Sequence, residues 1–348
     1  MPKKSENRET EIIEFIKNHP KCTSQEILDG LNLDISVATL RRKLQELVAE
    51  DLINAIGELK SRKYEISNGY NIIRPIDVEQ YFEKEIDERI IQDKFNSDLI
   101  SQTLQNISIF TNTELDQLNN LQEKFKSNSS KLSKSEYKNE LERLGIDLSW
   151  KSSQIEGNTY SLLETERLLK DKETAAGKTK DEATMLLNHK DALDFIIKNP
   201  NYINPLTVSS IEDIHSILVK ELDISRNIRS RRVGISGTNY KPLDNEFQIK
   251  EAVESMCTLI NSKKNVFEKA FLSLVLISYI QPFADGNKRT ARIISNAILI
   301  NNHFCPISFR TIDSIEYKKA MLVFYEQTNI SPFKKAFIGQ FEFAVNTY

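Results

Sequence analysis

Glycine and proline, the residues that interrupt helices most strongly, are scarce in this chain. There are 10 glycines and 9 prolines among 348 residues, and long segments place apolar side chains at helical spacing. The sequence therefore predicts a mainly α-helical protein, long enough for two or three domains with a sizeable core.

Charge, cysteine content and hydropathy narrow the class of protein further. The net charge of −3 gives no overall attraction to nucleic acid or membrane. Three scattered cysteines form neither a disulfide framework nor a metal-binding spacing, as expected in a reducing compartment. The N-terminus lacks the apolar segment of a signal peptide, and the longest apolar run, residues 270–280, is too short to span a bilayer. We therefore expect a cytoplasmic protein with no membrane partner.

Residues 1–68 predict a small domain of three helices followed by a hairpin. Apolar periodicity indicates helices over residues 8–18 and 25–31 and from residue 37, and β-like runs follow at 52–56 and 63–66. This order resembles the winged helix-turn-helix family, an α+β fold, and the resemblance implies binding of duplex DNA. The candidate DNA-binding residues are Arg41, Arg42, Lys60, Arg62 and Lys63.

Acidic residues lie among these cations, including Glu46, Asp51 and Glu58, so the domain lacks a strongly basic surface. A protein-docking or dimerisation role for the same domain is the alternative. If DNA is the ligand, we expect a homodimer, because one wing and one recognition helix do not hold a specific site alone.

The remainder of the chain divides into three predicted parts. Residues 69–130 are expected to form linker helices, among them a charged helix over residues 77–96. Residues 131–159 contain a further helix, and residues 160–348 form the main helical core.

The most informative segment is residues 281–292, which reads Gln-Pro-Phe-Ala-Asp-Gly-Asn-Lys-Arg-Thr-Ala-Arg. It links an apolar segment, residues 267–280, to a helix that starts near residue 289. Backbone amides at a helix start, with Arg289 and Arg292 on one face, can bind a polyphosphate.

The carboxylate of Asp285, which lies beside those cations in the sequence, suits Mg²⁺. The segment therefore predicts a magnesium–nucleotide site. The alternative is a basic helix N-terminus with Asp285 as its cap.

This segment resembles the signature of the Fic (Fido) family, His-x-Phe-x-Asp/Glu-Gly-Asn-Gly-Arg-x-x-Arg. Two positions depart from it, because Gln281 replaces the histidine and Lys288 replaces the second glycine. The matching residues are Phe283, Asp285, Gly286, Asn287, Arg289 and Arg292. The resemblance implies a Fic helical core with a short β-hairpin flap.

The resemblance also implies an activity. In the family, the histidine deprotonates a Ser, Thr or Tyr hydroxyl of a target protein, which attacks the α-phosphate of ATP and releases pyrophosphate. ATP and Mg²⁺, held by Asp285, are thus the implied cofactors. The implied nucleotide-binding residues are Gly286, Asn287, Lys288, Arg289, Thr290, Ala291, Arg292 and Tyr325.

A carboxamide accepts no proton near neutral pH, so Gln281 cannot serve as the general base, and we expect weak or absent transfer. One alternative is a pseudoenzyme that acts as a nucleotide-responsive DNA-binding regulator. Another is a phosphotransferase of the Doc type, which the Asn-Lys-Arg run at 287–289 resembles, although that branch lacks an arginine at 292 and has alanine at 286.

Two further stretches resemble parts of the same family. Residues 152–158 are similar to the inhibitory motif Ser/Thr-x-x-x-Glu-Gly/Asn, with Ser152 and Glu156 at its specified positions. The resemblance implies that Glu156 occupies Arg292 and competes with the γ-phosphate; the alternative is an ordinary helix end before Gly157.

Residues 229–242 resemble the β-hairpin flap. There Val233, Gly234 and Ile235 are expected to bind the target backbone as an added strand.

Overall fold

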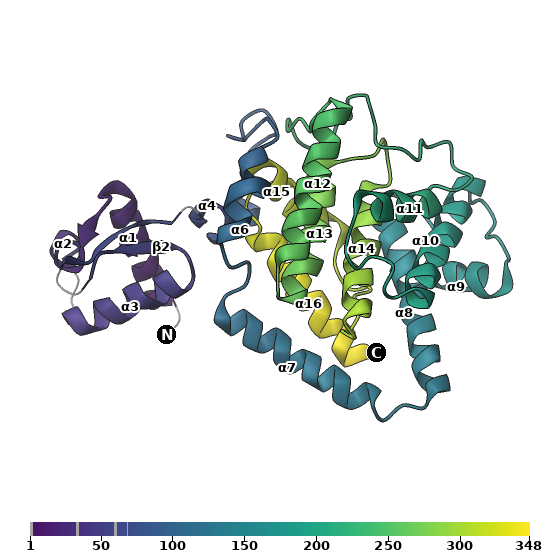
Figure 1. Ribbon diagram of the computed structural model, residues 1–348, viewed down its shortest axis with the longest axis horizontal. Coiled ribbons are helices and arrows are strands. Elements are labelled where there is room, and N and C mark those ends of the chain that lie inside the picture. The colour runs from purple at the N-terminus through teal and green to yellow at the C-terminus, as the bar shows by residue number, and fades with distance from the viewer. Residues whose placement is uncertain (1–2, 33–34, 59–60, 68) are drawn as a thin grey trace.

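The computed structural model describes residues 3–32, 35–58, 61–67 and 69–348, and most of these residues are helical (Figure 1). No helix within these ranges is long and apolar enough to cross a membrane. The N-terminal residues form a lobe of their own at one end of the molecule (Figure 1). Its helices are α1 (Lys3–Asn18), α2 (Ser24–Gly30) and α3 (Val37–Ala49), and its strands are β1 (Cys22–Thr23), β2 (Ile53–Ile56) and β3 (Lys63–Ile66).

Local signals explain this lobe. Helix α3 starts where the Ser36 side chain accepts a hydrogen bond from the backbone N–H of Thr39, and its buried stripe is Leu40, Leu44 and Leu47. The strands form an antiparallel sheet in the order β1-β3-β2, with Ala55 opposite Tyr64. The three helices and the hairpin are confirmed, whereas the winged-helix assignment stays a prediction. Lys60 lies outside the described residues.

The predicted charged helix over residues 77–96 is wrong. Only α4 (Tyr70–Ile73) and α5 (Val78–Tyr81) precede a non-helical connecting segment, residues 82–96. Backbone groups near the end of the segment bind the main body: Gln92 donates its N–H to the Glu326 carbonyl, and Asp93 accepts from the N–H of Lys241. The chain then enters η2 (Leu99–Thr103, a π-helix) and α6 (Leu104–Asn106).

Ten longer helices form the main body, with α13 at its centre. Every residue of α13 from Ala270 to Ile280 is buried, and α12, α14 and α15 pack on it (Figure 1). The ten helices are α7 (Asn112–Ser129), α8 (Lys134–Ile155), α9 (Leu162–Asp171), α10 (Lys180–Lys198), α11 (Val208–Leu218), α12 (Glu246–Ser262), α13 (Val266–Ile280), α14 (Asn287–Asn301), α15 (Ser314–Gln327) and α16 (Ser331–Thr347).

The predicted β-hairpin flap is not formed. Residues 229–242 contain no strand, and one isolated bridge joins Lys241 to Lys94 of the connecting segment. The ends of the flap segment are tied to other parts of the chain, because Arg229 donates its N–H to the Pro282 carbonyl while Lys241 donates to Asp93. The two halves of this segment therefore form no hydrogen-bonded strand pair.

A buried ion pair fastens the connecting segment to the main body. Arg89 Nη2 lies 3.3 Å from Glu326 Oε1, and the two side chains are 5% and 0% exposed. The Tyr81 hydroxyl donates to the other oxygen of Glu326 at 2.6 Å. Arg89 also donates to the carbonyl of Gly237 at 2.7 Å, so one guanidinium joins the connecting segment, α15 and the 229–242 segment.

Replacing Arg89 with alanine should destabilise the main body strongly. The substitution leaves the Glu326 carboxylate buried without its cation, which typically costs about 3–5 kcal/mol in the free energy of unfolding. Urea unfolding measures the loss. Lys319→Ala is the control. Lys319 lies on α15, as Glu326 does, and the substitution removes its partly exposed ion pair to Glu79, which should cost no more than about 1 kcal/mol. Equal losses for the two variants would contradict the role of the buried pair.

Candidate functional site

The loop between α13 and α14 depends on two residues with left-handed backbone. Gln281 ends α13 at φ 52° and ψ 59°, and Gly286 precedes α14 at φ 81°. Glycine adopts this conformation without steric cost. A side chain at position 286 would also place its Cβ 3.3 Å from His215 Nε2. Glycine at this position therefore lets the loop come close to α11 without backbone strain or a tight contact.

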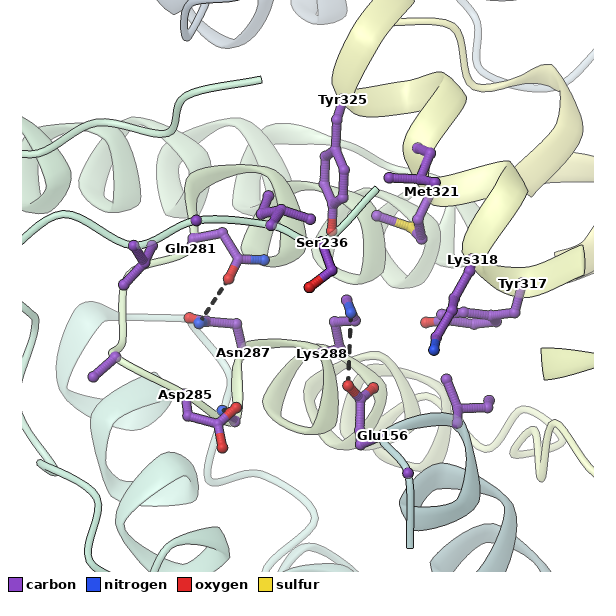
Figure 2. A pocket seen from close by; sticks show the side chains of 18 residues that line it. Glu156, Ser236, Gln281, Asp285, Asn287, Lys288, Tyr317, Lys318, Met321 and Tyr325 are labelled. Carbon is purple, nitrogen blue, oxygen red and sulfur yellow. Dashed lines mark hydrogen bonds and ion pairs between the residues drawn. The ribbon is translucent and has the colours of Figure 1, made fainter. Parts of the chain in front are cut away.

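The side chain of Gln281 is engaged in shaping the same loop. Its Nε2 donates to the Ser278 carbonyl at 2.7 Å, and its Oε1 accepts from Asn287 Nδ2 at 3.0 Å (Figure 2). Asn287 in turn bonds both backbone polar groups of Phe283, each at 2.8 Å. Both ends of the Gln281 amide thus serve a hydrogen-bond network that holds the loop closed.

His215 supports the loop from below, a role that the sequence did not reveal. Its ring stacks on Phe283 with 3.6 Å between centroids, and Nε2 lies 3.0 Å from the Asp285 carbonyl. The other nitrogen lies 3.1 Å from the Arg226 carbonyl. Desolvation lowers the pKa of His215, although the two carbonyls oppose the shift. The imidazole therefore lies between two backbone carbonyls and contacts the loop at Asp285.

The loop forms one wall of a cavity of about 320 Å³ (Figure 2). The end of α8, the segment 233–236 and one face of α15 supply the other walls. The lining residues are Ile155, Glu156, Gly157, Val233, Gly234, Ile235, Ser236, Gln281, Ala284, Asp285, Gly286, Asn287, Lys288, Tyr317, Lys318, Met321, Leu322 and Tyr325.

Glu156 brings a carboxylate against two cations at this cavity. Its Oε1 accepts from Arg292 Nη2 at 2.7 Å, and its Oε2 lies 3.6 Å from Lys288 Nζ (Figure 2). Burial alone would raise the pKa of Glu156, but the charge of Arg292, followed by that of Lys288, outweighs it and lowers the pKa. Glu156 is therefore ionised at neutral pH.

Ser152 joins the same cluster. Arg292 Nε donates to Ser152 Oγ at 2.8 Å, and Arg292 Nη2 donates to the Ser152 carbonyl at 3.0 Å. The structure thus brings together Ser152, Glu156 and Arg292.

The two arginines of the motif lie beneath the cavity and do not line it. Arg292 is 0% exposed and Arg289 is 1% exposed. Among the residues that the structure describes, Arg289 Nε and Nη1 and Arg292 Nη1 have no hydrogen-bond partner. Buried cationic N–H groups without acceptors suit an anion, so these residues fit a phosphate-bearing ligand.

Asp285 is the carboxylate that a divalent cation would meet first. Its side chain is 67% exposed, with one oxygen 3.4 Å from Arg289 Nη2 and the other accepting from the Gly286 N–H. Within the described ranges, no cluster of three or more His, Cys, Asp or Glu residues could hold a metal ion by itself. A Mg²⁺ ion at Asp285 would therefore need ligand oxygens as well, which is how this ion commonly binds.

The remaining predicted nucleotide-binding residues are placed differently from one another. Tyr325 lines the cavity, with its ring stacked 5.7 Å from that of Tyr240. Thr290 and Ala291 are buried in α14 and do not line the cavity, and the Thr290 hydroxyl donates to the Gly286 carbonyl.

Sequence reasoning missed the rest of the α15 wall. The missed residues are Tyr317, Lys318, Met321 and Leu322. They lie at helical spacing before Tyr325, so extending one helix face backwards from that tyrosine would have found them.

Comparisons with known proteins agree with this geometry. Residues 205–299 match the Fic/DOC family. A Fic domain containing signaling protein from Bacteroides thetaiotaomicron superposes with a TM-score of 0.58 at 21% identity, covering 66% of this chain and 94% of that chain. Fic-1 from C. elegans superposes with a TM-score of 0.57 at 20% identity, covering 67% and 71%. These two structures show a shared fold.

Relatives found by sequence are also Fic proteins, and each matches part of the chain. The protein adenylyltransferase Fic of Nematostella vectensis is 31% identical over 172 residues, which cover 48% of this chain and 40% of that protein. Its namesake in Aedes aegypti is 27% identical over 161 residues, or 44% and 32%. The matched region thus spans two fifths or less of these relatives. The motif loop, the helical fold and the family match together show that this chain contains a Fic/DOC family domain.

Proposed function

We propose that this chain binds Mg-ATP in the cavity described above and is related in chemistry to protein adenylyltransferases. We further propose that Glu156 blocks the site and that Gln281 leaves it without a general base. The observation that carries the proposal is the Glu156 carboxylate, bound to Arg292 and beside Lys288 at a cavity built by the motif loop. Sequence relatives named protein adenylyltransferase support it.

The chemistry assigns each residue a role. In adenylyl transfer, a target hydroxyl oxygen bonds to the α-phosphorus, the bond to the bridging oxygen breaks, and pyrophosphate leaves. Arg289, Arg292 and Lys288 would stabilise the negative charge of the phosphates. Mg²⁺, held by Asp285, would neutralise further phosphate charge when bound. The hydroxyl proton has no acceptor at position 281, because both ends of the Gln281 amide are hydrogen-bonded and the group is not basic.

The segment 233–235 is the proposed docking site for the target protein. It lines the cavity, and Val233 and Ile235 are half-buried while Gly234 is exposed. Within the described residues, it makes no backbone hydrogen bond to another part of the chain. Its N–H and C=O groups are thus available to an extended target peptide.

Gln281→His should restore transfer, because an imidazole can accept the hydroxyl proton. We expect self-modification or target modification to rise about 10²- to 10⁴-fold, the usual contribution of a general base. Incubation with ATP labelled at the α-phosphate measures adenylyl transfer, and a parallel reaction with γ-labelled ATP detects phosphoryl transfer instead.

Gln281→Ala is the matched control, because it also removes the hydrogen bonds of the Gln281 amide but supplies no base. The histidine variants should be made with and without Glu156→Gly, so that the block does not hide the effect. Equal transfer by the histidine and alanine variants would contradict the general-base argument.

Removing the Glu156 carboxylate should tighten ATP binding. Glu156→Gly frees Arg292 for phosphate, and a charge-assisted hydrogen bond corresponds to about a 10- to 100-fold change in affinity. Glu156→Gln, which loses charge but keeps a bond to Arg292, should fall between that variant and the unmodified protein. Calorimetry measures both.

Glu140→Gln is the control, since it removes a surface carboxylate from helix α8, where it pairs with Arg143.

The lowered pKa of Glu156 also sets the pH dependence of the block. The block should persist at neutral and alkaline pH and weaken only as acid protonates Glu156 below the ordinary range of a glutamate. Unchanged ATP affinity in Glu156→Gly would contradict the block and leave Glu156 as an ordinary helix-end residue.

A second candidate function is DNA binding by the N-terminal lobe. The observation that favours it is the exposed face of α3, which presents Arg41, Arg42 and Gln45 away from the buried stripe. Lys63 on β3 is exposed as well, whereas Lys43 is engaged by Glu9 at 2.7 Å. We propose that duplex DNA is bound by a dimer through these surfaces, with the protein-docking role as the alternative.

Arg42→Ala and Lys63→Ala should each weaken duplex binding and lower the slope of log affinity against log salt by about one unit. Fluorescence anisotropy at several salt concentrations, with genomic duplexes, measures both quantities. Lys17→Ala removes an exposed lysine of α1 and should leave binding unchanged. Absence of binding at low salt would favour the protein-docking role.

A further inference from the structure

Lys288 differs from the other cations of the motif in its position. It stands where the family signature has glycine, it lines the cavity, and its side chain is 24% exposed. Arg289 and Arg292 are almost fully buried and do not line the cavity. A ligand that enters the cavity therefore meets the ammonium of Lys288 before either guanidinium.

Glu156 divides its two oxygens between unlike cations. Oε1 receives a hydrogen bond of 2.7 Å from the buried Arg292, and Oε2 lies 3.6 Å from Lys288 Nζ. An ion pair at this longer distance and with partial exposure is weak. The lysine stem is flexible and its ammonium is a compact charge with three donors, so it can turn to another acceptor.

We propose that Lys288 has opposite effects on nucleotide binding in two states of the site. While Glu156 is in place, Lys288 reinforces the block by neutralising the second carboxylate oxygen. Once Glu156 has left, the same ammonium binds the polyphosphate of the nucleotide. This inference rests on the proposed function, because it requires a phosphate-bearing ligand in the cavity.

A double-mutant cycle tests the reversal. The four proteins are the unmodified chain, Lys288→Ala, Glu156→Gly and the combined variant, and calorimetry measures their affinities for Mg-ATP. With Glu156 present, Lys288→Ala should tighten binding about two- to five-fold, the scale of a partly exposed ion pair. With Glu156 absent, the same substitution should weaken binding about ten-fold or more.

Two controls isolate the charge. Lys318 lines the same cavity from α15 but takes no part in the ion pairs of Glu156, so Lys318→Ala should change affinity by the same factor in both backgrounds. Adenosine has no phosphate, so its affinity should be the same in Glu156→Gly and in the combined variant. Loss of adenosine binding in the combined variant alone would show that Lys288→Ala disturbs the cavity, and would overturn the proposal.

The outcomes separate this inference from the function on which it rests. If Lys288→Ala changes ATP affinity in the same direction in both backgrounds, the two-state role is wrong while nucleotide binding stands. If none of the four proteins binds ATP, the proposed function fails and the inference fails with it. A change of sign between the backgrounds, with adenosine unaffected, supports the proposal.

Discussion

A fully buried guanidinium, that of Arg292, joins the two helices that define the site. A cation at 0% exposure needs acceptors, and here Ser152 of α8 and Glu156 at the end of that helix provide them for Nε and Nη2. The end of α8 is thereby fixed against the start of α14. The position of the cavity, between those two helix ends, follows from that one requirement.

The loop above Arg292 is held by amides and an imidazole and contains no basic group positioned for proton transfer. Gln281, Asn287 and His215 together hold the backbone from Phe283 to Gly286 in one conformation. A preorganised loop of this kind favours ligand binding, because little ordering remains to be done when a ligand arrives. This geometry supports the proposal that the site holds a nucleotide without activating a hydroxyl.

Local signals in the sequence predicted the parts of the fold that local physics controls. Ser36 marks the start of α3, and the motif marks the turn from α13 into α14. Prediction was wrong where distant partners decide the conformation. Residues 82–96 carry charges that would suit a helix, yet their backbone bonds to Glu326 and Lys241 instead. The contact between His215 and Asp285 was not predicted, because Asp285 lies in a loop between two other helices. Such pairings become visible only when the helices are packed together.

The ion pair between Arg89 and Glu326 has a consequence for where this protein can be divided. The family match covers residues 205–299, but the cavity also needs the end of α8, and α15 is held by a segment that precedes residue 100. A fragment cut at the family boundaries would lose two walls of its own site. Recombination in evolution could exchange the N-terminal lobe near residue 70, where the short helix α4 joins it to the rest of the chain, and still leave the cavity whole (Figure 1).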